Sequence, residues 1–176
     1  MLEHKRIVLT GGPSSGKTSV LNNIQLPHIH CFEEVSRELI SEGQAKGINQ
    51  PFLNNPLHFS EAIFELRLHD YFEDCKNKNH VYDRGLHDVV AYLNAIGQDV
   101  PCGMLNDCSK YCYDVVFVFP PWEDIFVQDA ERVEVFEEAK RFHNALLKTY
   151  SYFGMQCIEV PKLRIEERLR FITDYV

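Results

Sequence analysis

One glycine-rich segment near the start of the chain constrains its fold more than any other feature. It reads Gly11-Gly12-Pro13-Ser14-Ser15-Gly16-Lys17-Thr18 and matches the pattern G-x-x-x-x-G-K-S/T at every specified position. A short apolar run, Ile7-Val8-Leu9, precedes it, and a helical pattern over 17–25 follows. This order of strand, loop and helix is typical of the phosphate-binding loop, or P-loop.

The chemistry of this loop is that of an anion site. Glycines allow backbone N–H groups to converge on one point, which the positive end of the following helix dipole also faces. Lys17 would contact the β- and γ-phosphates of ATP, with GTP as the alternative, and the Thr18 hydroxyl would be a ligand of Mg²⁺. A glycine-rich turn that binds nothing is the other interpretation. The residues expected around the phosphates are Gly11, Gly12, Pro13, Ser14, Ser15, Gly16, Lys17, Thr18 and Ser19.

The composition indicates a globular protein, and we expect one domain over residues 1–176. Hydrophobic residues make up 45% of the chain and charged residues 25%, as in ordinary folded proteins. The formal net charge of −8 argues against a nucleic-acid-binding surface, which needs clustered Lys and Arg. The six cysteines fit no common zinc pattern.

No apolar run approaches the roughly 20 residues that span a bilayer, and the start lacks a signal peptide, so we expect a cytoplasmic protein.

Short apolar runs alternate with helical patterns along the rest of the chain. This alternation predicts an α/β fold in which helices cover both faces of a parallel sheet. We expect further strands at 28–32, 80–82, 115–119 and 156–160, and further helices at 34–43, 56–76, 88–96, within 123–153 and at 164–175. Residues 47–56 are expected to form a loop, and the stretch around Pro101 and Gly103 to be irregular.

An acidic and a basic residue follow the expected strand at 80–82. Asp83 and Arg84 would therefore lie at the carboxyl edge of the sheet, where ligands bind in such folds. Asp83 would hold Mg²⁺ or act as a base toward an acceptor hydroxyl, and Arg84 would clamp a phosphate. A helix-capping Asp and a surface ion pair are the alternative. Asp88 is a weaker candidate, because an acid in the first turn of a helix is expected for capping alone.

Two further segments carry candidate residues. Glu34 and Arg37 lie three positions apart on one face of the expected helix and would bind an acceptor together, with an intrahelical salt bridge as the alternative. The segment PPWEDIFVQDAER follows the strand at 115–119 and predicts a mobile helical hairpin that acts as a lid. Its Arg132 would reach the transferred phosphoryl group as the lid excludes water; a solvated charged helix is the alternative. Trp122 is more typical of packing than of base stacking.

Five segments spread over nearly the whole chain resemble a known family. They read GGPSSGKTS, EEVSREL, VYDRGLHDVVAYL, VFVFPPWEDIFVQDAER and YSYFGMQCIEVP. In this order they resemble AAA-type ATPase-like proteins related to bacterial nicotinamide riboside kinases and, more distantly, to thymidylate and deoxynucleoside kinases. An insect protein required for TRPL channel trafficking, described as binding GTP and phosphoinositides, is similar too.

The resemblance implies a three-layer P-loop kinase fold with a five-stranded parallel sheet and a helical lid, and an NTP with Mg²⁺ as ligand. It also implies roles in catalysis and acceptor binding for Glu34, Arg37, Asp83 and Arg84, and a lid role for Arg132. We therefore predict transfer of the γ-phosphoryl group of ATP to a small nucleoside-like acceptor.

Other functions and the assembly state stay open at this point. A slow NTPase or nucleotide-dependent switch that binds a protein or phosphoinositide partner is the main alternative. An oligomeric AAA motor acting on nucleic acid is disfavoured, because the sequence shows no basic stripe and no clear arginine finger. A homodimer is common among kinases of this shape.

Overall fold

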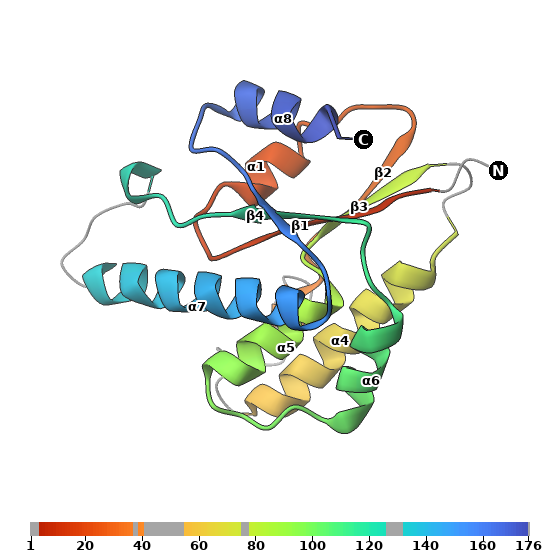
Figure 1. Ribbon diagram of the computed structural model, residues 1–176, viewed down its shortest axis with the longest axis vertical. Helices are drawn as coiled ribbons and strands as arrows, with labels where there is room; N and C mark the ends of the chain where they lie inside the picture. Colours follow the sequence, from red (N-terminus) through yellow and green to blue (C-terminus); the bar gives the residue numbers. More distant parts are fainter. Residues whose placement is uncertain (1–3, 37–38, 41–54, 75–77, 126–131, 176) are drawn as a thin grey trace.

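A five-stranded parallel sheet forms the centre of the computed structural model, which describes residues 4–36, 39–40, 55–74, 78–125 and 132–175 (Figure 1). The strands are β1 (Arg6–Gly11), β2 (Ile29–Phe32), β3 (Asn79–Asp83), β4 (Val115–Phe119) and β5 (Cys157–Glu159). They lie in the order β2-β3-β1-β4-β5, and all four neighbouring pairs are parallel. The predicted α/β class and its parallel sheet are confirmed.

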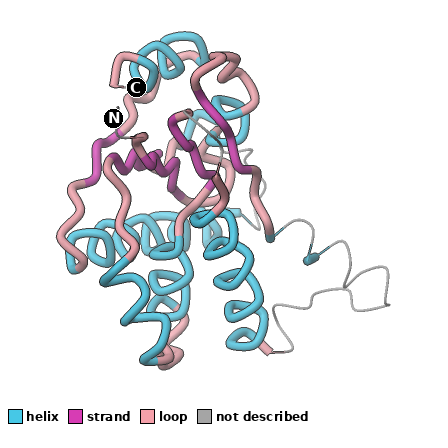
Figure 2. Tube along the Cα trace, turned by 90° about the vertical axis from the view of Figure 1, so that its right-hand side faces the viewer, coloured by secondary structure: helices cyan, strands magenta, loops and turns pink. Residues whose placement is uncertain are grey.

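Helices cover both faces of the sheet, because parallel neighbours must be joined by crossover connections. One face carries α1 (Lys17–Leu21) and α8 (Ile165–Thr173) (Figure 1). The other face carries α4 (Pro56–Phe72), α5 (Leu86–Ala95), α6 (Cys102–Lys110) and α7 (Arg132–Tyr152) (Figures 1 and 2). A short 3₁₀ helix, η1 (Glu123–Ile125), follows β4. The result is the three-layer arrangement expected of the fold.

The core is divided between the two faces by the alternation of side chains along each strand. On β1, Val8 belongs to the cluster under α4 and α5, which includes Phe64. Its neighbours Ile7 and Leu9 belong to the opposite cluster, which includes Val20 of α1. All three β1 side chains are fully buried, so the strand that leads into the P-loop is fixed from both sides.

The helix α6 corrects one prediction. An irregular stretch was expected around Pro101 and Gly103, but a helix begins at Cys102 with Pro101 as its N-cap. A proline at this position interrupts no helical hydrogen bond. Met104 and Cys108 lie one turn apart on this helix and are both buried in the core, and this packing stabilises a segment whose local signals indicate a loop.

Other boundaries differ by a few residues. The helix α5 begins at Leu86, two residues before its expected start, because Gly85 is its N-cap. The helix α1 ends at Leu21, earlier than the expected residue 25. Half of the helix expected at 34–43 and most of the loop expected at 47–56 lie outside the described residues. Within the described part of the chain, no helix combines the length and apolar character that a membrane crossing requires.

Candidate active site

The P-loop joins the end of β1 to α1, as the motif predicts. Its backbone is left-handed at Ser14 (φ 56°) and at Gly16 (φ 83°), a conformation that glycine adopts far more readily than other residues. Glycine is also required at position 16 for lack of room, because a Cβ there would lie 2.7 Å from Nη1 of Arg168. The Ser15 hydroxyl closes the turn by donating a hydrogen bond to the Gly12 carbonyl at 2.8 Å.

Lys17 is a buried cation at the start of α1. Its side chain curls back over the loop, and Nζ lies 3.4 Å from the carbonyl oxygen of Gly12. Burial, reinforced by the charge of Arg84, lowers the pKa of Lys17 to about 8, although nearby carboxylates such as Asp83 oppose the shift. An anionic ligand in the loop would stabilise the charged ammonium.

Thr18 and Asp83 meet across the gap between α1 and β3. The Thr18 hydroxyl lies 3.3 Å from Oδ2 of Asp83, and the register of β3 with β1 places Asp83 beside Leu9. Burial raises the pKa of Asp83, while Lys17 opposes this. The other carboxylate oxygen, Oδ1, is buried and has no hydrogen-bond partner among the described residues. A hydroxyl and an unpartnered carboxylate oxygen are oxygen donors of the kind that Mg²⁺ binds, so these residues fit the expected metal.

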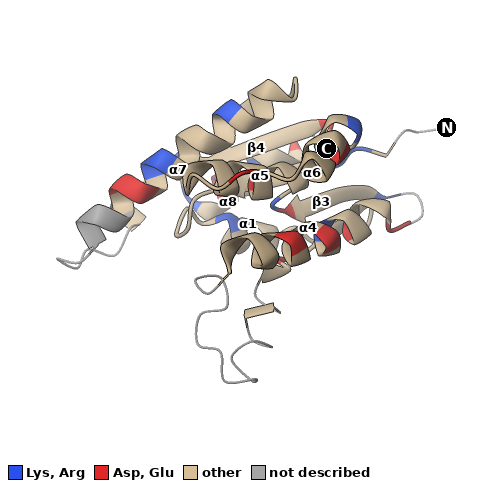
Figure 3. Ribbon diagram, turned by 90° about the horizontal axis from the view of Figure 1, so that it is seen from below, with Lys and Arg blue, Asp and Glu red and all other residues tan. Residues whose placement is uncertain are grey.

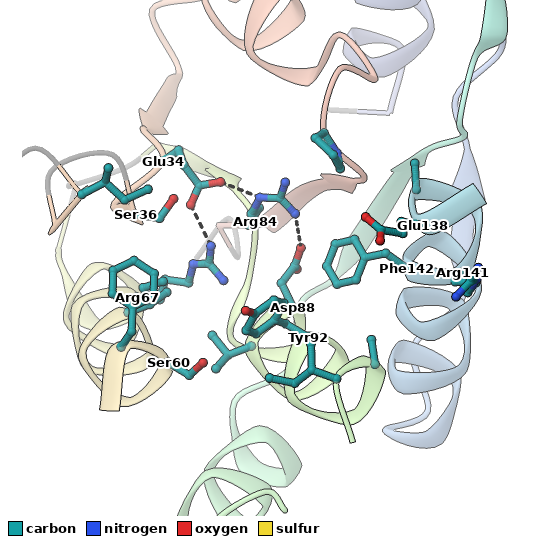
Figure 4. Close-up of a pocket in the computed structure, with 18 residues that line it drawn as sticks. Glu34, Ser36, Ser60, Arg67, Arg84, Asp88, Tyr92, Glu138, Arg141 and Phe142 are labelled. Atoms are coloured by element: carbon teal, nitrogen blue, oxygen red, sulfur yellow. Dashed lines mark hydrogen bonds and ion pairs between the residues drawn. The ribbon is translucent and has the colours of Figure 1, made fainter. Parts of the chain in front are cut away.

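Glu34 lies between two arginines (Figure 4). Arg67 Nη2 approaches its Oε1 to 2.8 Å, and Arg84 Nε approaches its Oε2 to 2.5 Å. Burial alone would raise the pKa of Glu34, but the two guanidinium groups lower it to about 2, so the carboxylate is ionised at neutral pH. Glu34 precedes the helical turn at Ser36 rather than lying on a helix, which corrects the expected shared helix face; Arg37 lies outside the described residues.

Arg84 adopts a strained backbone conformation. Its φ of 72° places a side chain other than glycine in the left-handed region, where residues are held only by strong surrounding contacts. Its N–H donates to the Leu9 carbonyl at 3.0 Å. Its guanidinium lies between Glu34 and Asp88, with the ring of Phe142 from α7 at 5.9 Å. These contacts therefore hold the Arg84 side chain in one place while its backbone stays in the strained left-handed conformation.

Arg67 belongs to this charged cluster but was not predicted from the sequence. This residue of α4 is 6% exposed, and its Nη1 donates to the carbonyl oxygen of Gly85 at 3.0 Å. The available signal was its spacing, since Arg67 follows Ile63 by four positions and Phe64 by three and so shares their buried helix face. An arginine on an apolar face needs a buried partner.

Asp88 does more than cap α5. Its Oδ2 accepts the expected capping bond from the Gly85 N–H at 3.0 Å, and also a bond from the Tyr150 hydroxyl at 2.6 Å. Its Oδ1 accepts from the Thr10 hydroxyl at 2.6 Å. Asp88 therefore connects the end of β1 with α5 and α7, three elements that surround the P-loop.

A pocket of about 590 Å³ opens beside these charges (Figure 4). Pro13 of the P-loop and the cluster of Glu34, Arg67, Arg84 and Asp88 line its charged end. The remaining walls are mostly apolar and aromatic and come mainly from α4, α5 and α7. They include Phe59, Ile63, Val89, Tyr92 and Phe142, together with Ile96 directly after α5. This size and this mixture of surfaces are typical of a small-molecule site.

The predicted lid is only partly described. Arg132 is the first residue of α7, and residues 126–131, which hold most of the expected hairpin, lie outside the described residues. Acidic residues recur along α4, whereas in the described part of α7 acidic residues come first and basic residues follow (Figure 3). Trp122 packs against Arg168 of α8, whose Cζ lies 5.5 Å from the ring centroid.

Solved structures share this fold. A deoxyadenosine kinase from M. mycoides with bound dATP has a TM-score of 0.66 at 14% identity, with 98% of each chain covered. The same enzyme with the products dCMP and a flexible dCDP gives 0.62 at 15% identity and 97% coverage of each chain. A thymidylate kinase from Ehrlichia chaffeensis gives 0.63 at 14% identity, with 98% of each chain covered. These similarities confirm the P-loop kinase-like fold.

Sequence comparison supplies the family. Comparison with curated proteins gave no match, and the relation to nicotinamide riboside kinases and to the insect trafficking protein stays a prediction. The AAA domain family matches residues 6–168. Since this match spans most of the chain and includes the P-loop, the protein belongs to the AAA domain family.

Proposed function

We propose that this protein transfers the γ-phosphoryl group of ATP, with Mg²⁺, to a hydroxyl group of a small nucleoside-like acceptor. The observation that carries the proposal is the position of Glu34. Held ionised by two arginines, it lies at the charged end of the 590 Å³ pocket, whose lining includes Pro13 of the P-loop. A site for an acceptor therefore adjoins a site for phosphates, as phosphoryl transfer requires.

The donor side would be formed by the P-loop and its neighbours. Backbone N–H groups of residues 11–19, apart from Pro13, would hold the phosphates, with Lys17 on the β- and γ-phosphates. Thr18 and Asp83 would hold Mg²⁺, which when bound neutralises charge on the phosphoryl oxygens. Arg132, at the start of α7, would supply a further cation.

The charges in the pocket favour a hydroxyl acceptor over a phosphate acceptor. The guanidinium groups of Arg67 and Arg84 are already paired with the carboxylates of Glu34 and Asp88. A phosphate would have to displace Glu34 or lie against its negative charge. A hydroxyl would instead donate a hydrogen bond to Glu34, because each carboxylate oxygen accepts more than one such bond.

Glu34 would orient the acceptor rather than remove its proton early. With a pKa of about 2, its carboxylate is a weak base at neutral pH. In phosphoryl transfer the protein contributes mainly positioning and electrostatic stabilisation, so an orienting carboxylate suits the reaction. Arg37, which follows Glu34 by three residues, would assist in binding the acceptor.

The apolar part of the pocket fits a planar, mostly apolar group. Aromatic side chains approach it from three helices: Phe59 from α4, Tyr92 from α5 and Phe142 from α7. Such rings stack well on flat heterocycles. The similar solved structure of a deoxyadenosine kinase also supports a nucleoside-like acceptor here.

A transfer assay tests the proposal. The purified protein is incubated with Mg-ATP or Mg-GTP and a panel of nucleosides, nucleoside monophosphates and nicotinamide riboside. We expect one or more hydroxyl acceptors to be phosphorylated well above background hydrolysis. Lys17→Ala should abolish nucleotide binding, and Glu34→Gln should lower kcat by roughly 10²-fold, as expected when an acceptor is misplaced, with nucleotide affinity unchanged. Glu138→Gln, at the same pocket, is the matched control.

Each variant is first checked for folding by its thermal unfolding midpoint, because Glu34→Gln weakens two buried ion pairs. Asp83→Asn provides a second inactive variant outside that cluster. Preferred phosphorylation of monophosphates would overturn the hydroxyl assignment. If nucleotide binds through Lys17 and no acceptor reacts, the kinase proposal is wrong and a nucleotide-dependent switch takes its place.

A further inference from the structure

Arg168 is a buried cation that supports the P-loop from outside. It lies on α8, with 5% of its surface exposed, and its Nη1 donates a hydrogen bond to the carbonyl oxygen of Ser15 at 3.2 Å. The same nitrogen is the nearest atom to the position of a Cβ on Gly16. The guanidinium therefore rests directly against the Ser15–Gly16 peptide.

Among the described residues, no carboxylate lies within salt-bridge distance of Arg168. Its other neighbours include the rings of Phe119 and Trp122, with Cζ 5.9 Å and 5.5 Å from their centroids. Its Nε is buried without a hydrogen-bond partner in this part of the structure. Burial in these surroundings lowers the pKa of Arg168. A cation placed here without a compensating carboxylate indicates a role beyond an ordinary buried ion pair.

The planarity of the peptide bond connects this contact to the phosphate site. In a trans peptide the C=O and N–H groups point to opposite sides. Because the Ser15 carbonyl is held toward Arg168, the N–H of Gly16 must point away from α8. A positive charge at the carbonyl oxygen also polarises the peptide and makes that N–H a stronger donor to an anion.

We infer that Arg168 is a positioning residue of the P-loop, which holds the Ser15–Gly16 peptide so that the Gly16 N–H faces the phosphates. This inference rests on the proposed binding of nucleotide phosphates by the loop. Arg168 would act without touching the ligand's reacting atoms. It would also act independently of the acceptor, because α8 lies across the sheet from the helices that line the acceptor pocket (Figure 1).

Two anionic probes test the inference by calorimetric titration: Mg-ADP and Mg-tripolyphosphate, which lacks the nucleoside. Arg168→Met should weaken binding of both probes by the same factor, about tenfold for a charge-assisted hydrogen bond. Arg168→Lys, which keeps a cation, should recover part of the loss. Arg170→Met, an exposed arginine on the same helix, is the matched control and should bind like the wild type.

Three results would overturn the inference: wild-type affinity in folded Arg168→Met, a loss no larger than in Arg170→Met, or a loss confined to Mg-ADP. The third result would place Arg168 on the nucleoside instead of the loop. Folding is checked by circular dichroism and the thermal unfolding midpoint. If the Met variant does not fold, Arg168→Gln replaces it. We expect a smaller loss of affinity for Arg168→Gln, and wild-type affinity in this variant would contradict the inference. Failure of the wild type to bind either probe would instead overturn the proposed nucleotide site itself.

Discussion

At the residue scale, Lys17 predicts how nucleotide binding depends on pH. Its pKa is lowered to about 8 by burial beside Arg84, and a bound phosphate would favour the charged ammonium. Above pH 8, binding must therefore be accompanied by proton uptake, so affinity should fall by up to about tenfold per pH unit. Titration with Mg-ADP from pH 7 to 9.5 measures this. Lys17→Arg keeps its charge over that range and should be nearly insensitive to pH; an equally flat wild-type profile would contradict the prediction.

His87 predicts a second pH dependence, this time of stability. It is fully buried, its Nε2 lies 3.0 Å from the Cys108 carbonyl, and burial lowers its pKa to about 4. Between pH 6.5 and 4 the unfolded chain binds a proton here that the folded chain does not. The free energy of unfolding should therefore decrease as pH falls through this window, by at most about 1.4 kcal/mol per pH unit from this residue.

Urea unfolding at several pH values checks the His87 prediction. His87→Leu should have a shallower decrease toward acid pH, and His58→Leu, at an exposed histidine, should keep the wild-type slope. Some slope should remain in His87→Leu, because burial lowers the pKa of His80 and His143 as well. Equal slopes in all three proteins would rule out a neutral buried His87.

The sequence places some of these residues better than others. Asp83 and Arg84 follow a recognisable strand, and the carboxyl ends of parallel strands share one edge, so their position near the P-loop was predictable. Arg67 comes from a helix 33 residues after its partner Glu34. Only tertiary packing brings them together. The catalytic and metal-binding roles given to these residues stay predictions.

At the element scale, the turn between β3 and α5 depends on the absence of a side chain at Gly85. A Cβ there would lie 2.8 Å from Cε2 of Tyr113 and 2.8 Å from the hydroxyl of Tyr150. Gly85→Ala should therefore lower the free energy of unfolding by about 1–3 kcal/mol, as one of these rings must move. Chemical unfolding measures the loss. Gly103→Ala, where a Cβ would meet nothing within 4 Å, is the control; a loss no greater than the control's would show that the rings adjust freely.

Elements with a single dominant signal were predicted well. The apolar run Val115–Phe119 forms β4 with the expected bounds. The helix α6 was missed, because Pro101 and Gly103 are local loop signals and only burial of Met104 and Cys108 against the core outweighs them. Helix ends also shifted where a cap such as Gly85 set the first residue.

At the scale of the whole molecule, the fold class followed from the alternation of strand and helix patterns, but the strand order did not. The order β2-β3-β1-β4-β5 depends on which crossover lies on which face, and the apolar runs are too similar to decide that. The match to kinase structures confirms the fold. One domain over 1–176, a cytoplasmic location and a homodimer stay predictions.

The contact between Trp122 and Arg168 gives the protein a built-in optical probe. Trp122 is the only tryptophan in the sequence, and it packs on the guanidinium that holds the P-loop carbonyl. Its fluorescence should therefore respond to Mg-ADP as well as to global unfolding, without any added label.

Arg168→Met should keep the unfolding signal and lose most of the response to Mg-ADP, whereas Trp122→Phe should show neither. If wild-type emission is constant during a titration that calorimetry shows to be binding, the ring does not sense the loop. Otherwise, occupancy of the P-loop and integrity of the fold can be read from one natural chromophore in the same cuvette.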